Sequence, residues 1–154
     1  MKNSNNNKII AVNKKAGYEY FLLEFFEAGM SLLGTEIKSL RRNGANIKES
    51  YVVIRNGEAY IINMHIAEYK EAHGFNHEPY RTRKLLLHKK EILRLVGKVK
   101  EDGVTLIPTK VYLKDGRAKL EFALAKGKKL YDKREDSKKK SMEKEARRYS
   151  KEKY

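Results

Sequence analysis

The stretch that decides the fold runs from Thr105 to Ala125 and reads TLIPTKVYLKDGRAKLEFALA. At its centre, Asp115-Gly116 is a dipeptide typical of a two-residue type I′ turn, because both residues tolerate the positive φ that the turn requires. After the turn, apolar and polar residues alternate from Lys119 to Leu124, which is the pattern of a half-buried strand. The stretch therefore predicts a β-hairpin made of Thr105–Lys114 and Arg117–Ala125.

A second hairpin of the same kind is expected nearer the N-terminus. There, Asn56-Gly57 separates Tyr51–Arg55 from Glu58–Asn63, again with residues that accept a positive φ. Two further apolar runs precede it, Tyr18–Phe26 and Met30–Leu33, and we expect a break between them at Ala28-Gly29. The pattern thus predicts six short strands.

Two helices are expected between these strands. Thr35–Arg42 begins with a residue that can cap a helix, and Leu85–Lys98 has apolar residues at helical spacing and ends near Gly97. The predicted order is β-β-α-β-β-α-β-β. We interpret this as a mainly β fold, a small OB-like barrel of about six strands with two or three helices that is closed or nearly closed. An α+β open sheet is the alternative.

The two ends of the chain differ in composition from the middle. Met1–Lys8 is polar and rich in asparagine, and we expect residues 1–8 to form a disordered arm before a barrel over residues 9–131. From Lys126 to Tyr154 there are 13 basic and 6 acidic residues, and the only large aliphatic side chains are Leu130 and Met142. Such a segment cannot build a core, so residues 132–154 are predicted to be a basic tail that is disordered when free.

The overall charge points to a polyanionic partner. The 154 residues carry 35 Lys+Arg against 20 Asp+Glu, a formal net charge of +15, and nucleic acid is the usual polyanion for such a protein. The chain has no cysteine, which excludes disulfides and thiolate zinc sites. No apolar run approaches the ~18 residues of a membrane span, and the N-terminus lacks the apolar core of a signal peptide. We expect a cytoplasmic protein.

Catalytic and metal-binding motifs are weak. His73 and His77 have the i,i+4 spacing of two ligands on a helix, but Gly74 and Pro79 argue against a helix there. We therefore favour a loop over a metal site. Glu36-Ile37-Lys38 resembles half of a nuclease site, but no convincing second carboxylate accompanies it. We predict no catalytic residue, no metal ligand and no cofactor.

Three basic clusters remain, and together with the net charge they favour RNA binding. They are Arg41-Arg42, Arg81–Lys84 and Lys126–Lys129 leading into Lys133-Arg134. No helix carries the set of Arg, Asn and Gln side chains expected of a major-groove reader. Structured RNA is therefore a better partner than duplex DNA.

Several longer motifs, in this order and spacing, resemble the SmpB family. They are GTEIKSLR (34–41), INMHI (62–66), RTRKLLLHK (81–89), GRAK (116–119) and LAKGKKLYDKR (124–134). The resemblance runs from about Ile9 to Arg134 and continues loosely through the tail. Several motifs in series are far more specific than any one of them alone.

The resemblance implies an adaptor of trans-translation rather than an enzyme. It implies an OB-like, monomeric barrel that binds the tRNA-like domain of transfer-messenger RNA (tmRNA, also called SsrA). The complex would be delivered to the A site of a stalled ribosome together with elongation factor Tu and GTP. The tail would fold as a helix in the empty mRNA channel near the decoding centre.

The resemblance and the basic clusters together select candidate residues. Asn13, Glu27 and Leu86 match family positions implicated in RNA binding, and we add the basic residues Lys14, Lys15, Arg41, Arg81, Arg83, Lys84, Lys126, Lys128 and Lys129. For the ribosome we select the tail residues Tyr131, Asp132, Lys133, Arg134, Lys138, Lys139 and Lys140. Two other hypotheses remain, a general rRNA-binding assembly factor and a metal-dependent nuclease.

Overall fold

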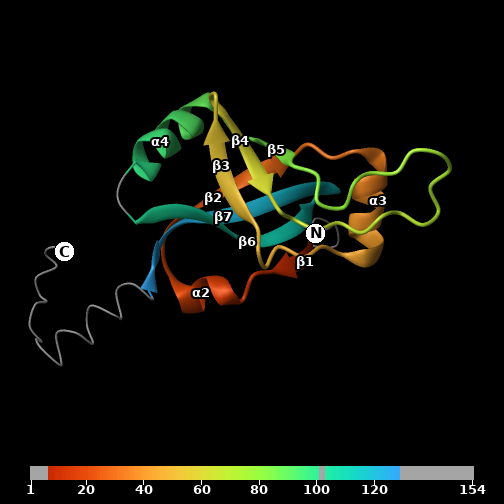
Figure 1. Cartoon of the computed structure of the whole chain (residues 1–154), viewed down its shortest axis with the longest axis horizontal. Helices are drawn as coiled ribbons and strands as arrows, with labels where there is room; N and C mark the ends of the chain where they lie inside the picture. The colour runs from red at the N-terminus through yellow and green to blue at the C-terminus, as the bar shows by residue number, and fades with distance from the viewer. Residues whose placement is uncertain (1–6, 101–102, 129–154) are drawn as a thin grey trace, which may run out of the picture.

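Seven strands and three helices make up the part of the chain that the computed structural model describes, residues 7–100 and 103–128. The strands are β1 (Lys8–Val12), β2 (Tyr20–Met30), β3 (Tyr51–Arg55), β4 (Glu58–Ile62), β5 (Arg83–Leu86), β6 (Val104–Lys114) and β7 (Arg117–Gly127). The helices are α2 (Lys15–Glu19), α3 (Gly34–Asn43) and α4 (Lys89–Val99) (Figure 1). The predicted mainly β fold is confirmed.

Both predicted hairpins form with the expected turns. Asn56 and Gly57 have φ angles of 49° and 76°, and Asp115 and Gly116 have 52° and 80°, so each turn has the two positive values of type I′. The turn at Asp115-Gly116 fixes the register in which Lys114 pairs with Arg117, and this pairing continues along the hairpin of β6 and β7.

The strands form one antiparallel sheet in the order β1-β6-β7-β2-β5-β4-β3. β1 and β3 are its two edges, so hydrogen bonds do not close the sheet, and of the two expected forms, closed or nearly closed, the structure has the second. The sheet instead curls until β3 lies against β6. It therefore encloses its core as a barrel does, and OB-like describes it loosely.

The core fills the concave side of this curled sheet. Leu120, Phe122 and Leu124, the apolar face that the period-two pattern of β7 predicts, are at most 5% exposed. Phe26 of β2 stacks on Phe122 with ring centroids 5.5 Å apart. Leu95 of α4 packs into the same cluster and is fully buried. The burial of these side chains provides the main favourable free energy of folding.

The N-terminal part differs from the prediction. β1 and α2 were not expected, and β1 begins at Lys8, inside the predicted arm. β2 continues through Ala28-Gly29 to Met30, so the break there and the strand at Met30–Leu33 are both wrong. A Cβ atom on Gly29 would lie 3.4 Å from the Cβ atom of Leu86. This glycine therefore allows β2 and β5 to approach closely rather than ending the strand.

The boundary before α4 also differs. The predicted helix Leu85–Lys98 starts too early, because Arg83–Leu86 pairs with β2 and β4 as strand β5. α4 begins after His88, whose backbone N–H donates to the Glu91 carboxylate at 3.2 Å. It also passes through Gly97 to Val99. Short apolar runs such as Leu85–Leu87 fit a strand or a helix equally well, and strand pairing decides between them.

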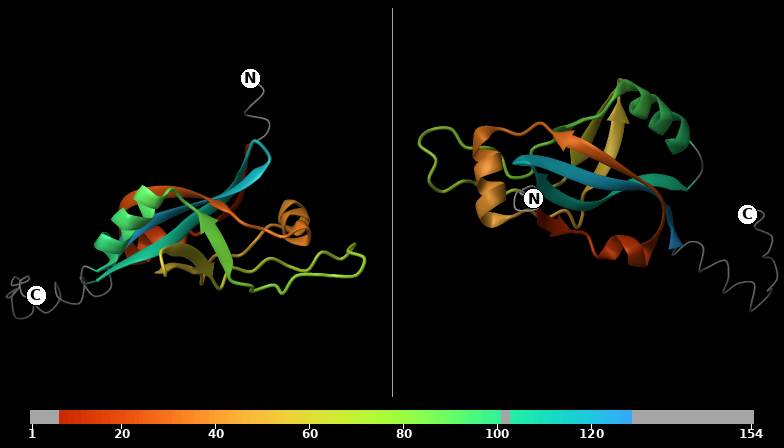
Figure 2. Two further views of the ribbon diagram at one scale, coloured as in Figure 1. Left: turned by 90° about the horizontal axis from the view of Figure 1, so that it is seen from above. Right: turned by 180° about the vertical axis from the view of Figure 1, so that it is seen from behind.

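Helices α3 and α4 lie at opposite ends of the sheet, and the long connection between β4 and β5 lies at the α3 end (Figures 1 and 2). In all three views α4 lies at one end and α3 at the other, and the connection between β4 and β5 extends past α3 (Figures 1 and 2). Among the helices described, none has the length and apolar character needed to cross a bilayer. The predicted tail, residues 132–154, lies outside the described residues.

Candidate nucleic-acid interface

An open groove lies between β2 and the start of α4. β2 pairs with β5 only at Gly29–Leu86 and Met30–Leu85, and the chain then turns away into α4. The hollow that results has a volume of about 720 Å³. We call it the β2–α4 groove, and the side chains that line it and carry the argument are Phe25, Glu27, Lys84, Leu86, Arg94 and Lys119.

The β2–α4 groove brings together three of the predicted RNA-binding residues. Glu27 of β2 lines the same hollow as Leu86 and Lys84 of β5, although more than 50 residues separate β2 from β5 in the sequence. Two apolar side chains are exposed on its wall, Leu86 and Phe25, each 53% accessible. A surface that combines exposed apolar groups, cations and a carboxylate can hold an RNA with unpaired bases.

Glu27 is held by groups that the sequence analysis did not select. The hydroxyl of Tyr112 donates a hydrogen bond to Oε2 of Glu27, and Nζ of Lys114 lies 3.7 Å from the same oxygen. The hydrogen bond from Tyr112 holds the pKa of the Glu27 carboxyl below its ordinary value. The hairpin register could have pointed to Tyr112, because counting back from Asp115-Gly116 pairs it with Lys119 on the same face.

Lys84 is an exposed cation with an acidic partner on the neighbouring strand. Its Nζ lies 2.9 Å from Oε1 of Glu58 on β4, and both side chains are more than 40% exposed. An ion pair in this environment contributes at most about 1 kcal/mol to stability. A phosphate can therefore compete for Lys84 at little cost.

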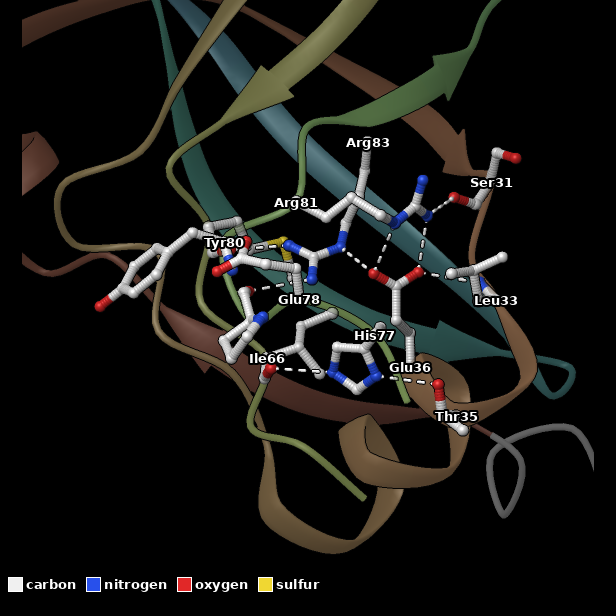
Figure 3. Close-up of polar contacts among 12 residues, drawn as sticks. Ser31, Leu33, Thr35, Glu36, Ile66, His77, Glu78, Tyr80, Arg81 and Arg83 are labelled. Atoms are coloured by element: carbon white, nitrogen blue, oxygen red, sulfur yellow. Dashed lines mark hydrogen bonds and ion pairs between the residues drawn. The ribbon is translucent and has the colours of Figure 1, made fainter. Parts of the chain in front are cut away.

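The cluster at Arg81–Lys84 splits into surface and interior residues. The Glu36 carboxylate binds both arginines, with Oε1 2.7 Å from Nη2 of Arg81 and Oε2 2.7 Å from Nε of Arg83 (Figure 3). Arg83 also donates to the backbone oxygens of Met64 and Pro79, at 2.7 and 3.0 Å. Because Arg83 is fully buried, its side chain is structural, and we leave it out of the candidate interface.

Glu36 is also a buried structural residue. Burial by itself would raise the pKa of Glu36, but hydrogen bonds from Arg81, from the backbone N–H of Leu33 and from Arg83 outweigh it and lower the pKa to about 2. The carboxylate also sets the start of α3, since it accepts the N–H of Leu33 at 2.8 Å. Thr35 was expected to cap this helix, and that expectation is wrong because α3 begins one residue earlier, at Gly34.

His77 is a buried structural residue. Its Nδ1 lies 2.9 Å from the hydroxyl of Thr35 and its Nε2 lies 2.9 Å from the backbone oxygen of Ile66 (Figure 3). Both ring nitrogens are therefore occupied. Within residues 7–100 and 103–128, no group of three or more His, Asp or Glu side chains could hold a metal ion.

A second group of predicted residues lies around α2. Asn13 precedes this helix, is 8% exposed, and donates from Nδ2 to the backbone oxygen of Pro108 at 3.0 Å. Lys14 is exposed beside it, and Nζ of Lys15 lies 3.9 Å from carboxylates of both Glu19 and Glu49. Asn13 and Lys15 line a smaller hollow of about 300 Å³, separate from the β2–α4 groove.

The remaining basic residues are distributed over both ends of the sheet. Arg41, on α3, donates from Nη2 to the backbone oxygen of Gly116 at 3.1 Å, and Arg81 lies at the same end through Glu36. At the other end, Lys126 is exposed and Nζ of Lys128 donates to the backbone oxygen of Gly17 at 3.0 Å. Lys129 and the seven selected tail residues, Tyr131, Asp132, Lys133, Arg134, Lys138, Lys139 and Lys140, lie outside the described residues.

Comparisons with known proteins agree on one family. The model of the family described as SmpB protein matches residues 10–152. A protein named SsrA-binding protein from Desulforudis audaxviator (strain MP104C) is 57% identical over 141 residues, which is 92% of each chain. One of the same name from Enterococcus faecalis (strain ATCC 700802 / V583) is 53% identical over 141 residues, again 92% of each chain.

A solved structure is also similar to this chain. It is described as "tmRNA-SmpB: a journey to the center of the bacterial ribosome". The two share 45% sequence identity with a TM-score of 0.67, and the match covers 85% of this chain and 92% of the other. At that level of identity the likeness extends beyond the fold.

Proposed function

Because this chain belongs to the SmpB protein family, we propose that it is an RNA-binding adaptor of trans-translation whose ligand is transfer-messenger RNA. It binds the tRNA-like domain of that RNA and delivers it to the A site of ribosomes that have stalled. The names of its relatives, SsrA-binding protein, and the tmRNA-SmpB description of the similar structure support this ligand.

The observation that carries the proposal is the composition of the β2–α4 groove. Glu27 and Leu86, selected by the family resemblance, and Lys84, selected by its basic cluster, line one hollow with Phe25 and Lys119. Lysines can neutralise phosphates, apolar groups can contact unstacked bases, and a carboxylate can accept hydrogen bonds from base amino groups or 2′-hydroxyls. A folded RNA that exposes a loop offers phosphates, unstacked bases and hydrogen-bond donors together.

The C-terminal segment has a separate task in this proposal. Residues 132–154 enter the empty mRNA channel, where the segment folds as a helix and its lysines meet ribosomal RNA near the decoding centre. The 13 basic residues of 126–154 favour such a site through charge. We further propose that the protein acts as a cytoplasmic monomer, and that elongation factor Tu with GTP joins it through the RNA.

A competition experiment tests the RNA specificity. Labelled tRNA-like domain is bound to the full chain at ~150 mM salt, because at lower salt a protein of this charge binds any RNA. Unlabelled tRNA-like domain and unlabelled rRNA fragments of equal length then compete. The proposal expects the rRNA to compete at least ten-fold less well. Equal competition would favour a general rRNA-binding factor.

The same RNA serves to test for nuclease activity. The tRNA-like domain is incubated with the full chain, with added magnesium and then with added manganese, and its length is followed on a denaturing gel. An adaptor leaves the RNA intact, whereas divalent-dependent shortening would support a nuclease.

A further inference from the structure

Two carboxylates face each other across β2 and β7. Glu27 pairs directly with Glu121 in the register of these strands, and like charges at directly opposed positions destabilise a sheet. Each carboxylate is drawn toward a different set of partners. Glu121 accepts a hydrogen bond from the Thr109 hydroxyl at 2.7 Å and lies 3.9 Å from Nζ of Lys110. The chain thus tolerates an unfavourable pair and compensates each member separately.

The partner of Glu27 reaches it across a whole strand. Tyr112 belongs to β6, and β7 lies between β6 and β2 in the sheet. Two strand spacings correspond to roughly 10 Å, and the two side chains span this gap together above β7, where the Tyr112 hydroxyl donates to Oε2 of Glu27. Burial, together with the neighbouring Glu27, raises the pKa of Tyr112, so the phenol remains a donor.

The arrangement leaves one oxygen of Glu27 available. Tyr112 and Lys114 both approach Oε2, and in the described part of the chain no group is hydrogen-bonded to Oε1. The Glu27 side chain is 40% exposed and lines the β2–α4 groove beside Leu86. One oxygen is therefore held by groups of the protein, while the other has no hydrogen bond within the described residues, on a side chain that lines the groove.

We infer that Tyr112 is a positioning residue, which orients Glu27 so that Oε1 accepts a hydrogen bond from a base amino group or a ribose 2′-hydroxyl of the bound RNA. This inference rests on the proposed function, because it assumes that the β2–α4 groove holds RNA. Tyr112 thus contributes to RNA binding although its own hydroxyl need not touch the RNA. It also gives a carboxylate a role in a basic interface, since the carboxylate repels a phosphate and favours a hydrogen-bond donor at this position.

The charged groups around Glu27 come from three strands. Lys110 and Lys114 belong to β6, Lys119 and Glu121 to β7, and Lys84 to β5. A change in the titration of Glu27 on removal of the Tyr112 hydroxyl reports the hydrogen bond between them, because the substitution alters none of these charged groups.

The test is a double-mutant cycle on the full chain with the isolated tRNA-like domain as probe. Tyr112→Phe should weaken binding about ten-fold, as expected for the loss of a hydrogen bond to a charged group. In the Glu27→Ala background, which has no side-chain acceptor for the Tyr112 hydroxyl, the same substitution should have little further effect. Tyr80→Phe is the matched control, because this tyrosine is 52% exposed and contacts His65 through its ring. It should bind like the parent.

Two further readouts separate positioning from a structural role. The melting temperature of Tyr112→Phe should stay within a few degrees of the parent, while the Glu27 carboxyl pKa, followed by ¹³C NMR, should rise. Parent-like binding by Tyr112→Phe, or an equal loss in both backgrounds, would overturn the inference. So would a large fall in melting temperature without coupling to Glu27.

Failure of the proposed function has a different outcome. If the parent chain itself binds rRNA fragments as tightly as the tRNA-like domain, the proposed ligand is wrong. If the parent discriminates and Tyr112→Phe is unaffected, only the role of Tyr112 is wrong.

Discussion

The Oε2 atom of Glu36 lies 2.7 Å from Nε of Arg83, and both side chains are completely shielded from solvent. This contact joins the first turn of α3 to β5 across 47 residues of sequence. Arg81 adds a second contact to the same carboxylate from the surface side. The long connection between β4 and β5 is thereby tied to the helix, since Arg83 also bonds the backbone oxygens of Met64 and Pro79.

Glu36→Ala should therefore be strongly destabilising. It leaves the Arg83 guanidinium buried without its counter-ion, a change that typically lowers the free energy of unfolding by about 3–5 kcal/mol. Urea unfolding followed by circular dichroism measures the loss. The control is Glu71→Ala, which removes the partner of Arg42 in an exposed ion pair and should cost less than about 1 kcal/mol. Equal losses of unfolding free energy in the two variants would mean that the buried ion pair of Glu36 stabilises the fold no more than an exposed one.

The same carboxylate predicts how stability depends on pH. Its folded-state pKa of about 2 lies below the ordinary value of 4.5, so the unfolded state binds a proton first as the pH falls. The contribution of Glu36 is thus fully present well above pH 4.5 and is lost as the pH falls through 4.5 toward 2. The difference in unfolding free energy between the parent chain and Glu36→Gln should shrink over that range. A difference that stays constant down to pH 2.5 would contradict this.

Much of the fold could be predicted from local chemistry, and the exceptions have a common cause. Asn56-Gly57 and Asp115-Gly116 identify their hairpins because the turn geometry depends on these residues alone. Arg83 and Gly29 could not be interpreted in that way. The sequence shows Arg83 in a basic run, but its ion pair with the buried Glu36 makes it a structural residue. The sequence likewise shows Gly29 as a strand breaker, but the close approach of Leu86 keeps it inside a continuous strand.

The candidate site shows the same division. Glu27, Lys84 and Leu86 were selectable from the sequence, because charge and resemblance to a family mark individual residues. Their meeting in one groove depends on the pairing of β2 with β5, which no local pattern encodes. Tyr112 was missed because the hairpin register places it opposite Lys119 but does not show that β2 lies beside β7, and its contact with Glu27 depends on that pairing.

Leu86→Asp should weaken binding of the tRNA-like domain by about ten-fold or more without unfolding the protein, since loss of a central apolar contact costs about 1–2 kcal/mol. Leu86 is 53% exposed, so its replacement leaves the core intact. The adjacent residue provides the control. Leu85 is 1% exposed, and Leu85→Asp should lower the melting temperature sharply, because it buries a carboxylate in the core. If Leu86→Asp also melts early, Leu86 is structural.

Deletion of residues 132–154 should separate the two proposed tasks of the chain. The shortened protein keeps the β2–α4 groove, so its affinity for the tRNA-like domain at ~150 mM salt should change less than three-fold. Tagging of nascent chains on stalled ribosomes in a reconstituted translation system should be abolished. A truncated chain that loses RNA affinity as severely as tagging would refute the division.

The central claim is that this chain has tmRNA as its ligand in cells. The most direct measurement is to recover the full-length protein from growing cells under its natural expression and to sequence the RNA that co-purifies with it. The account predicts that tmRNA is enriched far above its share of total cellular RNA. Recovery of RNA that mirrors the cellular pool, without enrichment of any RNA carrying a tRNA-like domain, would contradict it.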